Sequence, residues 1–148
     1  MSKISVLMSV YKKENPEYLR ASLESILVQT RTADEILLIE DGPLTQELYQ
    51  VVAEYQKKCD YLHVHAMEQN VQLGRALAKG VELCQYDLIA RMDTDDIAMP
   101  DRLEKEGAYM EAHPEVDVVG GAIREFNDEG TIDLSLIHIS EPTRHLRI

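Results

Sequence analysis

The chain has 148 residues, of which 45% are hydrophobic and 28% are charged, and this length and composition suit one globular domain with its own buried core. Lys and Arg number 15 and Asp and Glu number 27, so the formal net charge is −12. This acidic balance argues against nucleic acid as a partner, because a phosphate backbone is bound by clustered Lys and Arg side chains. It leaves open a smaller phosphate-bearing ligand, because a bound cation can invert the local sign of the charge.

The start of the sequence, its hydropathy and its cysteines indicate an intracellular protein. Met1-Ser2-Lys3 leads directly into the first expected strand, without a signal peptide. No apolar run approaches the roughly 18 residues that a membrane span needs. Cys59 and Cys84 are isolated, and we expect them to be reduced packing residues. We therefore expect a cytoplasmic protein, either free or attached peripherally at the inner face of the membrane.

Strand-like and helix-like patterns alternate along the chain, as is typical of a parallel α/β sheet. The first strand is an uncharged run, and the helix after it begins at Asn15-Pro16, an N-cap followed by proline at the first helical position. The second strand ends on the acidic Glu40-Asp41-Gly42, and Thr45 caps the next helix. The expected strands are residues 4–10, 36–39, 61–67, 88–90 and 116–123, and the expected helices are residues 15–29, 45–55, 70–84 and 100–113.

Two further patterns have structural interpretations. His63 and His65 alternate on one face of the third strand, and no third or fourth ligand is placed nearby, so we expect strand residues near a sheet edge rather than a zinc site. Gly74, Ala78 and Gly80 would let the following helix lie close to the sheet or to a ligand. A close approach would explain the interior glycines, which otherwise cost about 1 kcal/mol each in helix stability.

The end of the chain fits no expected element. Residues 132–148 resemble translated adapter sequence of the kind found at the end of truncated reading frames. If this segment is native, it forms a short strand and a polar tail. We therefore expect one domain over residues 1–131, followed by a non-native or disordered tail over residues 132–148.

The chemistry is concentrated where the fourth strand ends. Asp93, Asp95 and Asp96 follow the apolar run within a few positions. In an open α/β sheet, ligands bind at the carboxyl ends of the strands. Because like charges this close repel one another, a hard divalent cation with oxygen ligands, Mn²⁺ or Mg²⁺, is the natural partner. The plainer alternative is a solvated acidic turn that caps the following helix.

Two sharper alternatives fit these aspartates less well. In an EF-hand loop starting at Asp93, Glu104 would be the last ligand, but Ile97 and Ala98 occupy a ligand position and the obligatory glycine, and Pro100 follows. A phosphotransferase with an Asp-X-Asp nucleophile would carry its aspartates on the first strand, followed by Thr or Val where this chain has Ile97.

Several motifs occur together in a fixed order: Ser9-Val10-Tyr11, Glu40-Asp41-Gly42, the segment from Asn70 through Gly74 to Gly80, and Ala90-Arg91-Met92-Asp93-Thr94-Asp95-Asp96. Together they resemble the N-terminal, nucleotide-sugar-binding half of a family 2 glycosyltransferase with the GT-A fold, over roughly residues 3–130. In particular, they are similar to bacterial enzymes that assemble capsular, O-antigen or exopolysaccharide units. The resemblance implies a Rossmann-like, mostly parallel sheet flanked by helices, truncated here at its C-terminal side.

The resemblance also implies roles for single residues. Tyr11 and Asp41 match positions that contact the uracil base of a UDP-sugar, Asp41 by accepting from the base N3–H. Asp93 matches the first aspartate of the Asp-X-Asp motif, near the ribose and the metal. Asp95 matches the last aspartate, which meets the divalent cation that bridges the donor diphosphate.

Three further residues belong to the same expected site. Arg91 and Arg75 would lie near the phosphates, and Asp96 could assist at the metal. In a doubly wound sheet, a crevice forms at the switch point beside the first strand. If the second and third strands lie on one side of the first and the aspartate-tipped strand lies on the other, the base contacts and the Asp-X-Asp motif converge there.

The chain departs from the family pattern in two respects. Gln72 stands where many relatives carry glycine. The catalytic base, an aspartate or glutamate that serves the acceptor hydroxyl, belongs to the C-terminal half that this chain lacks, so its identity is unknown. We expect the parent enzyme to be an inverting transferase that acts on a saccharide or lipid-linked acceptor, and this chain alone to be inactive.

Two rival functions differ in what they require. A sugar-phosphate nucleotidyltransferase needs a Gly-rich, Arg-bearing loop directly after the first strand, and residues 11–15 contain neither glycine nor arginine. A non-catalytic nucleotide-sugar-binding module fits the chain as it stands. A turnover assay beside a binding assay separates this module from an enzyme.

Overall fold

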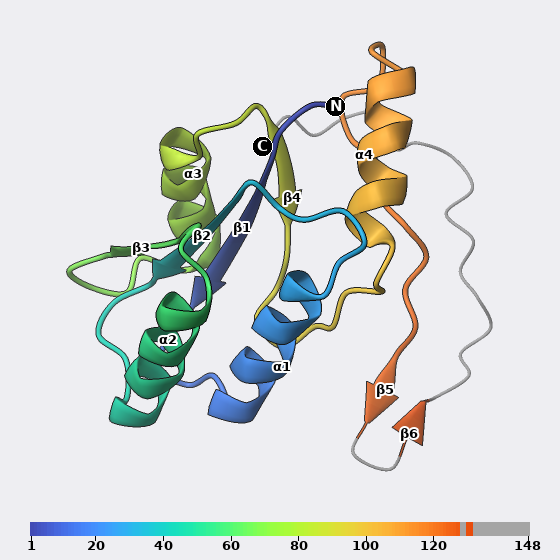
Figure 1. The fold of residues 1–148 in the computed structure, drawn as a ribbon. Helices are drawn as coiled ribbons and strands as arrows, with labels where there is room; N and C mark the ends of the chain where they lie inside the picture. Colours follow the sequence, from blue (N-terminus) through green and yellow to red (C-terminus); the bar gives the residue numbers. More distant parts are fainter. Residues whose placement is uncertain (128–129, 132–148) are drawn as a thin grey trace. The chain divides into compact units, whose positions relative to one another are not determined.

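The computed structural model describes residues 1–127 and 130–131 (Figure 1). From the first strand to the fourth helix, strands and helices alternate as the sequence predicts. The elements are β1 (Ile4–Val10), α1 (Pro16–Leu27), β2 (Glu35–Glu40), α2 (Gln46–Lys58), β3 (Leu62–Ala66), α3 (Leu73–Leu83), β4 (Leu88–Arg91), α4 (Arg102–Ala112), β5 (Phe126–Asn127) and β6 (Gly130–Thr131). The chain forms two compact units, one over Met1–Glu104 and one that begins at Lys105.

The first unit is built on a four-stranded parallel sheet with the strand order β3-β2-β1-β4. β1 lies inside this sheet and is paired in parallel with β2 on one side and with β4 on the other. β3 pairs with β2 at the edge of the sheet, so His63 and His65 are edge-strand residues as predicted. The second and third strands therefore lie on one side of the first and the fourth lies on the other, which is the order that the expected crevice requires.

Helices cover both faces of the sheet (Figure 1). Side chains alternate along β1, so that Val6 and Met8 pack in one core cluster with α1 and α2, while Leu7 packs with α3 in a second cluster. All six residues of β2 are buried. Continuous burial of this kind is typical of a parallel strand that is covered on both faces.

Local capping signals fix the starts of the first two helices. The Asn15 side chain accepts a hydrogen bond from the Glu17 N–H at 2.8 Å, and a proline follows Asn15 at the start of α1. Thr45 Oγ1 accepts from the Leu48 N–H at 3.3 Å at the start of α2. Each cap satisfies an amide group that a helix leaves free at its first turn. Both predicted helix starts are confirmed.

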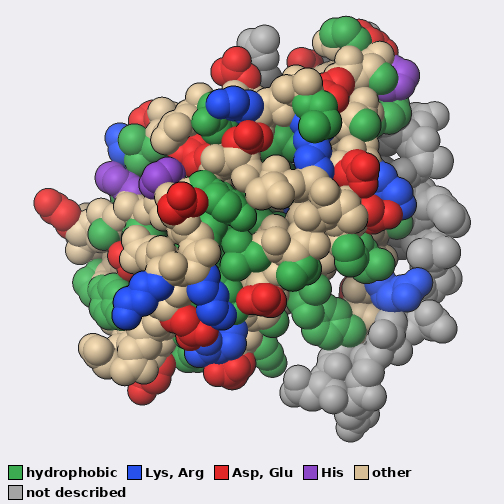
Figure 2. Space-filling model, in the orientation of Figure 1, with side chains coloured by type: hydrophobic (Ala, Val, Ile, Leu, Met, Phe, Trp, Pro, Cys, Tyr) green, Lys and Arg blue, Asp and Glu red, His purple; other side chains and the backbone are tan. Residues whose placement is uncertain are grey.

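Ion pairs join the outer surfaces of α1 and α2. Arg20 of α1 is paired with Glu54 of α2, and Lys58 approaches the same carboxylate at 3.3 Å. Figure 2 shows Lys and Arg side chains interspersed with Asp and Glu over this part of the molecule. Because exposed pairs contribute little to stability, we attribute the packing of the two helices mainly to the apolar core beneath them.

Gly80 allows α3 to lie directly against β1. A β-carbon on Gly80 would come within 2.3 Å of Leu7 Cδ1, whereas a β-carbon on Gly74 would meet nothing within 4 Å. Gly80 and Leu7 are both buried. The close approach predicted for this helix is therefore made to the sheet, at Gly80, and Gly74 has no packing role of this kind.

Both cysteines are free thiols. Cys59 is buried and Cys84 is half-buried. Burial raises the pKa of the Cys84 thiol to about 11, so that this thiol stays protonated at neutral pH and behaves as a packing residue. In the part of the chain that the structure describes, no helix has both the length and the apolar character needed to cross a membrane.

The strand predicted over residues 116–123 is not formed. Residues 118–125 have no regular secondary structure, and a short antiparallel pair of β5 with β6 follows them. A strand is stable only where a partner satisfies its backbone groups, and nothing in the described range pairs with this segment. The two adjacent glycines, Gly120 and Gly121, also make an ordered strand costly in entropy. The tail predicted over residues 132–148 lies outside the described residues.

Replacing Gly80 with alanine should lower the free energy of unfolding, although alanine is the better helix former by about 1 kcal/mol. The added methyl group would overlap Leu7 in a packed core, and overpacking of this kind costs roughly 1–3 kcal/mol. We expect a net loss on the order of 1 kcal/mol, measured by urea unfolding. Gly74→Ala on the same helix is the matched control and should be neutral or stabilising. Equal losses in the two variants would contradict the packing role of Gly80.

Candidate functional site

The segments that follow β1, β2 and β4 meet beside the end of β1. The Asp41 N–H donates to Val10 O at 2.8 Å, and Thr94 Oγ1 lies 3.4 Å from Ser9 O. Tyr11 follows β1 directly. Because the strands are parallel, their carboxyl ends share one edge of the sheet. The sheet therefore brings the loops that carry Tyr11, Asp41 and the aspartates to the same place.

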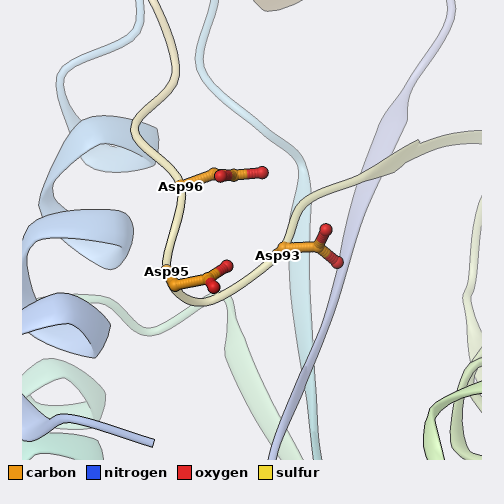
Figure 3. A group of neighbouring side chains, drawn as sticks. All are labelled: Asp93, Asp95 and Asp96. Atoms are coloured by element: carbon orange, nitrogen blue, oxygen red, sulfur yellow. The ribbon is translucent and has the colours of Figure 1, made fainter. Parts of the chain in front are cut away.

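Asp93, Asp95 and Asp96 project from one tight turn (Figure 3). The Asp96 N–H donates to Asp93 O at 3.2 Å and closes this turn. One carboxylate oxygen of each residue lies within 4.8 Å of the others, and the three side chains extend in the same direction in the view of Figure 3. All three are at least partly exposed. Accessible oxygens at this spacing can share a hard divalent cation.

Repulsion within the acidic turn is only partly offset by neighbouring cations. Partial desolvation, followed by the charges of Asp95 and Asp93, raises the pKa of Asp96. Arg102 and Arg91 act in the opposite direction, and Arg91 also forms an ion pair with Asp93 at 3.0 Å. The turn keeps an excess of negative charge that a divalent cation would relieve. The residues present therefore fit the Mn²⁺ or Mg²⁺ that the GT-A resemblance implies.

Thr94, the middle residue of the Asp-X-Asp motif, anchors the acidic turn. It is only 3% exposed, and its hydroxyl donates to Glu14 Oε2 at 2.6 Å. Glu14 belongs to the loop after β1, whose turn is closed by the Glu14 N–H donating to Tyr11 O at 3.0 Å. The loop that carries Tyr11 and the acidic turn are therefore joined directly. No local pattern signals this contact in the sequence, because Thr94 and Glu14 lie 80 residues apart.

Asp41 organises the loop between β3 and α3. It is 4% exposed, Oδ1 accepts from the Val71 N–H at 2.7 Å, and Oδ2 accepts from Asn70 Nδ2 at 3.3 Å. The adjacent Gly42 has φ +87°, and a β-carbon there would lie 2.6 Å from Asn70 N, so glycine is required. Asp41 thus has a structural role that the sequence did not reveal. Because carboxylate oxygens accept more than one hydrogen bond, these contacts leave capacity for a ligand N–H.

The other predicted nucleotide contacts are open to solvent. Tyr11 is 44% exposed at the end of β1. Arg91 is exposed at the end of β4, and Arg75 is exposed in the first turn of α3. Helix α3 begins after the carboxyl end of β3, the edge of the sheet at which β1 and β4 also end. All three side chains therefore belong to the edge of the sheet that carries the acidic turn.

Gln72 adopts a backbone conformation that strongly favours glycine. Its φ is 72° and its ψ is 157°, immediately before α3, in a region that is essentially restricted to glycine. The conformation is held by hydrogen bonds on both sides: the Gln72 N–H donates to Asn70 Oδ1 at 3.2 Å, and the Ala76 N–H donates to Gln72 O at 3.0 Å. The departure from the family pattern at this position therefore corresponds to backbone strain in the loop that Asp41 organises.

Known proteins resemble this chain over most of its length. The profile of Glycosyl transferase family 2 matches residues 5–147. An uncharacterized glycosyltransferase of Haemophilus influenzae is 52% identical over 124 residues, which cover 84% of this chain and 46% of the relative. The amylovoran biosynthesis glycosyltransferase AmsE of Erwinia amylovora is 44% identical over 141 residues, or 95% and 53% of the two chains. The UDP-Gal:alpha-D-GlcNAc-diphosphoundecaprenol beta-1,3-galactosyltransferase of Escherichia coli is 35% identical over 136 residues, or 88% and 48%.

Solved structures share the fold at lower sequence identity. S. aureus TarS 1-349 in complex with UDP-GlcNAc matches with a TM-score of 0.67 and 23% identity, over 76% of this chain and 32% of that one. The mannosyltransferase PcManGT from Pyrobaculum calidifontis, in complex with GDP-Man and Mn²⁺, matches with a TM-score of 0.66 and 14% identity, over 74% and 32%. At these identities the likeness shows the fold alone.

The parallel sheet and these structural matches define an α/β protein of the GT-A class. Within that class, the chain belongs to Glycosyl transferase family 2. It spans about half the length of the curated relatives that it matches, between 46% and 53% for the proteins of Haemophilus influenzae, Erwinia amylovora and Escherichia coli.

Replacing Gln72 with glycine should stabilise the protein. The strain of a non-glycine residue in this conformation costs roughly 1–3 kcal/mol, while glycine makes the unfolded chain more flexible at a cost of about 0.4–1 kcal/mol. We therefore expect the free energy of unfolding to rise by about 1 kcal/mol, measured by urea unfolding. Gln69→Gly in the same loop is the matched control, because Gln69 lacks a positive φ, and it should lose stability. A loss in both variants would contradict the strain at Gln72.

Proposed function

We propose that this chain is the donor-binding part of an inverting, metal-dependent glycosyltransferase. It binds a UDP-sugar, and the whole enzyme transfers the sugar to a saccharide or lipid-linked acceptor in polysaccharide biosynthesis. One observation carries this proposal: three carboxylates converge in the turn after β4, beside the buried Asp41 and the loop of Tyr11. This arrangement offers a base-binding side and a diphosphate-binding side at the same edge of the sheet.

Uracil is the proposed base because of the chemistry available at Asp41. Its carboxylate is an acceptor without a donor, and it suits the N3–H of uracil, while the exposed Tyr11 ring lies on the adjacent loop and offers a surface for the base. Two comparisons support a UDP-sugar: TarS was solved with UDP-GlcNAc, and the relative from Escherichia coli is named for UDP-Gal.

Asp95 and Asp93 are the proposed ligands of Mn²⁺ or Mg²⁺, and Asp96 assists them. The three residues supply the oxygen ligands that such ions prefer, and the structurally similar PcManGT was solved with GDP-Man and Mn²⁺. When bound, the ion neutralises the donor diphosphate and stabilises it as a leaving group. The exposed guanidinium groups of Arg91 and Arg75 supply further contacts to phosphate in this proposal.

The acceptor and the catalytic base belong to the part of the relatives that this chain does not match. A base must reach the acceptor hydroxyl to remove its proton, and we assign no residue of this chain to that task. Support for a lipid-linked acceptor comes from the name of the Escherichia coli relative, which refers to a diphosphoundecaprenol. An enzyme with such an acceptor would act in the cytoplasm, at the inner face of the membrane.

A non-catalytic nucleotide-sugar-binding module is the alternative function for the chain by itself. It uses the same residues for the same ligand, so that binding measurements alone do not distinguish the two. Turnover of the donor with an acceptor distinguishes them.

Asp95→Asn should remove most metal-dependent UDP binding without unfolding the chain. Asparagine keeps the shape of the side chain but removes its charge, and Asp95 is exposed, so the fold should tolerate the change. For the unsubstituted protein, we expect calorimetry to show clearly tighter UDP binding with Mn²⁺ than with EDTA, and for Asp95→Asn a much smaller difference. Asp87→Asn, another exposed carboxylate, directly before β4, is the matched control. Equal UDP affinity with and without metal in the unsubstituted protein would contradict the proposed metal site.

The 148-residue chain should bind UDP with metal and yet transfer no sugar at a measurable rate. General-base catalysis contributes about 10²–10⁴-fold, and orientation of the acceptor contributes more. The measurement is donor turnover by this chain, by residues 1–131 and by the full reading frame, with the same acceptor. Robust transfer by the 148-residue chain would show that its base lies among residues to which we give no catalytic role.

A further inference from the structure

Three polar side chains lie on the buried side of α1 and just beyond its end. Ser22, Ser25 and Gln29 are all buried, and Ser22 is completely inaccessible. A spacing of three residues places Ser22 and Ser25 on one stripe of the helix, and Gln29 follows Ser25 by four residues, just past the helix end. Apolar residues normally fill such positions, and a buried polar group is costly unless it is hydrogen-bonded. The three side chains therefore need partners inside the fold. Two of these side chains bond locally: Ser25 Oγ donates to Ser22 O at 2.7 Å, and Gln29 Nε2 donates to Ser25 O at 3.0 Å.

Their partners outside α1 are backbone groups of the connection from β4 to α4 and of the first turn of α4. Ser22 Oγ donates to Asp93 O at 3.0 Å, and Ser25 Oγ accepts from the Ala98 N–H at 3.0 Å. Gln29 uses both ends of its amide: Nε2 donates to Met99 O at 2.7 Å, and Oε1 accepts from the Leu103 N–H at 3.0 Å. We name these three side chains of α1 and its C-terminal extension the α1 clamp.

The α1 clamp fixes the acidic turn from both ends. Ser22 binds the same carbonyl, Asp93 O, that accepts the Asp96 N–H and closes the turn. Ser25 and Gln29 bind the chain where it returns to the core, at the buried Ala98 and at Met99. Between these anchors, Asp95 and Asp96 are exposed. The clamp thus holds the backbone in place while it leaves the carboxylates free.

We infer that Ser22, Ser25 and Gln29 are positioning residues for the metal site. Three like charges within one turn repel one another, and a turn without anchors would open and separate them. The α1 clamp holds the carboxylates at a spacing suited to a cation before the cation binds, so that little of the binding free energy is used to close the turn. This inference rests on the proposed metal-binding function. It gives α1 and its C-terminal extension an indirect role, because their side chains bind the backbone of the turn and do not themselves contact the metal.

The decisive comparison is between two buried serines. Ser25→Ala removes the acceptor of the Ala98 N–H, whereas Ser5→Ala removes an equally buried hydroxyl that bonds to Glu35 and to the Tyr86 N–H. Ser5 lies near the amino end of β1, away from the acidic turn. Mn²⁺ affinity is measured by electron paramagnetic resonance of the free ion, without nucleotide. Stability is measured in parallel by urea unfolding, so that affinities are compared only for folded protein.

We expect Ser25→Ala to weaken Mn²⁺ binding roughly tenfold, the lower end of the range for groups that orient metal ligands. Ser5→Ala should lose comparable stability and bind Mn²⁺ as the unsubstituted protein does. Ser25→Thr, which keeps the hydroxyl, should restore affinity. If Ser25→Ala does not fold, Ser22→Ala gives the same comparison. Removing the Ser22 hydroxyl leaves Asp93 O still bonded to the Asp96 N–H, so no buried group loses its last partner and the variant should fold. Unchanged Mn²⁺ affinity in a folded Ser25→Ala or Ser22→Ala variant would overturn the inference, as would equal weakening by Ser5→Ala.

A second readout does not depend on metal. Hydrogen exchange of the Asp96 amide reports whether the turn is closed, because this N–H is the donor to Asp93 O. We expect exchange in metal-free protein to become severalfold faster in Ser25→Ala and to stay unchanged in Ser5→Ala. If the unsubstituted protein binds no Mn²⁺, the proposed function fails, while the exchange result still decides whether the α1 clamp holds the turn. Unchanged Asp96 exchange in Ser25→Ala would overturn the positioning role.

Discussion

The pairing of β1 on both sides is the constraint on which the rest of the structure depends. Its parallel partners, β2 and β4, run in the same direction, so the loops that follow all three strands leave at one edge of the sheet. Those loops carry Tyr11, Asp41 and the acidic turn. The same strand also separates two layers of core, with α1 and α2 on one face and α3 on the other. The candidate site is thus assembled by the packing of apolar residues that do not belong to it.

The acidic turn is compatible with this fold because its backbone, and not its carboxylates, is bound to the core. Three buried residues anchor the chain, Met92 before the turn, Thr94 within it and Ala98 after it, while Asp95 and Asp96 remain at the surface. Contacts reach this segment from the loop after β1 through Glu14 and from α1 through the clamp. Negative charge is therefore concentrated where solvent and ions have access, in a protein whose net charge is already −12. A cation shared with a diphosphate would offset this local negative charge and would allow an acidic protein to bind an anionic ligand.

Local pattern in the sequence was enough to predict the four strands of the sheet, whereas their order entered only as the condition for the expected crevice, and the structure meets that condition. Uncharged runs mark β1 and β2, and Asn15 and Thr45 mark the helix starts, because these signals act within a few residues. The pattern misled at residues 116–123, where a strand-like composition has no partner in the described range. Contacts between distant residues were also beyond reach: the sequence shows polar residues on the inner stripe of α1, but their partners lie about 70 residues later. The backbone angle of Gln72 became visible only in three dimensions.

The central claim is that the acidic turn holds the metal of a bound nucleotide diphosphate. Anomalous diffraction at the manganese edge, from crystals grown with Mn²⁺ and UDP, tests it most directly, because the signal identifies both the element and its position. The account predicts one strong peak between the carboxylates of Asp93, Asp95 and Asp96, next to the diphosphate, with uracil at Asp41. Ordered UDP at Asp41 without a manganese peak at the turn, or a peak at another group of residues, would contradict it.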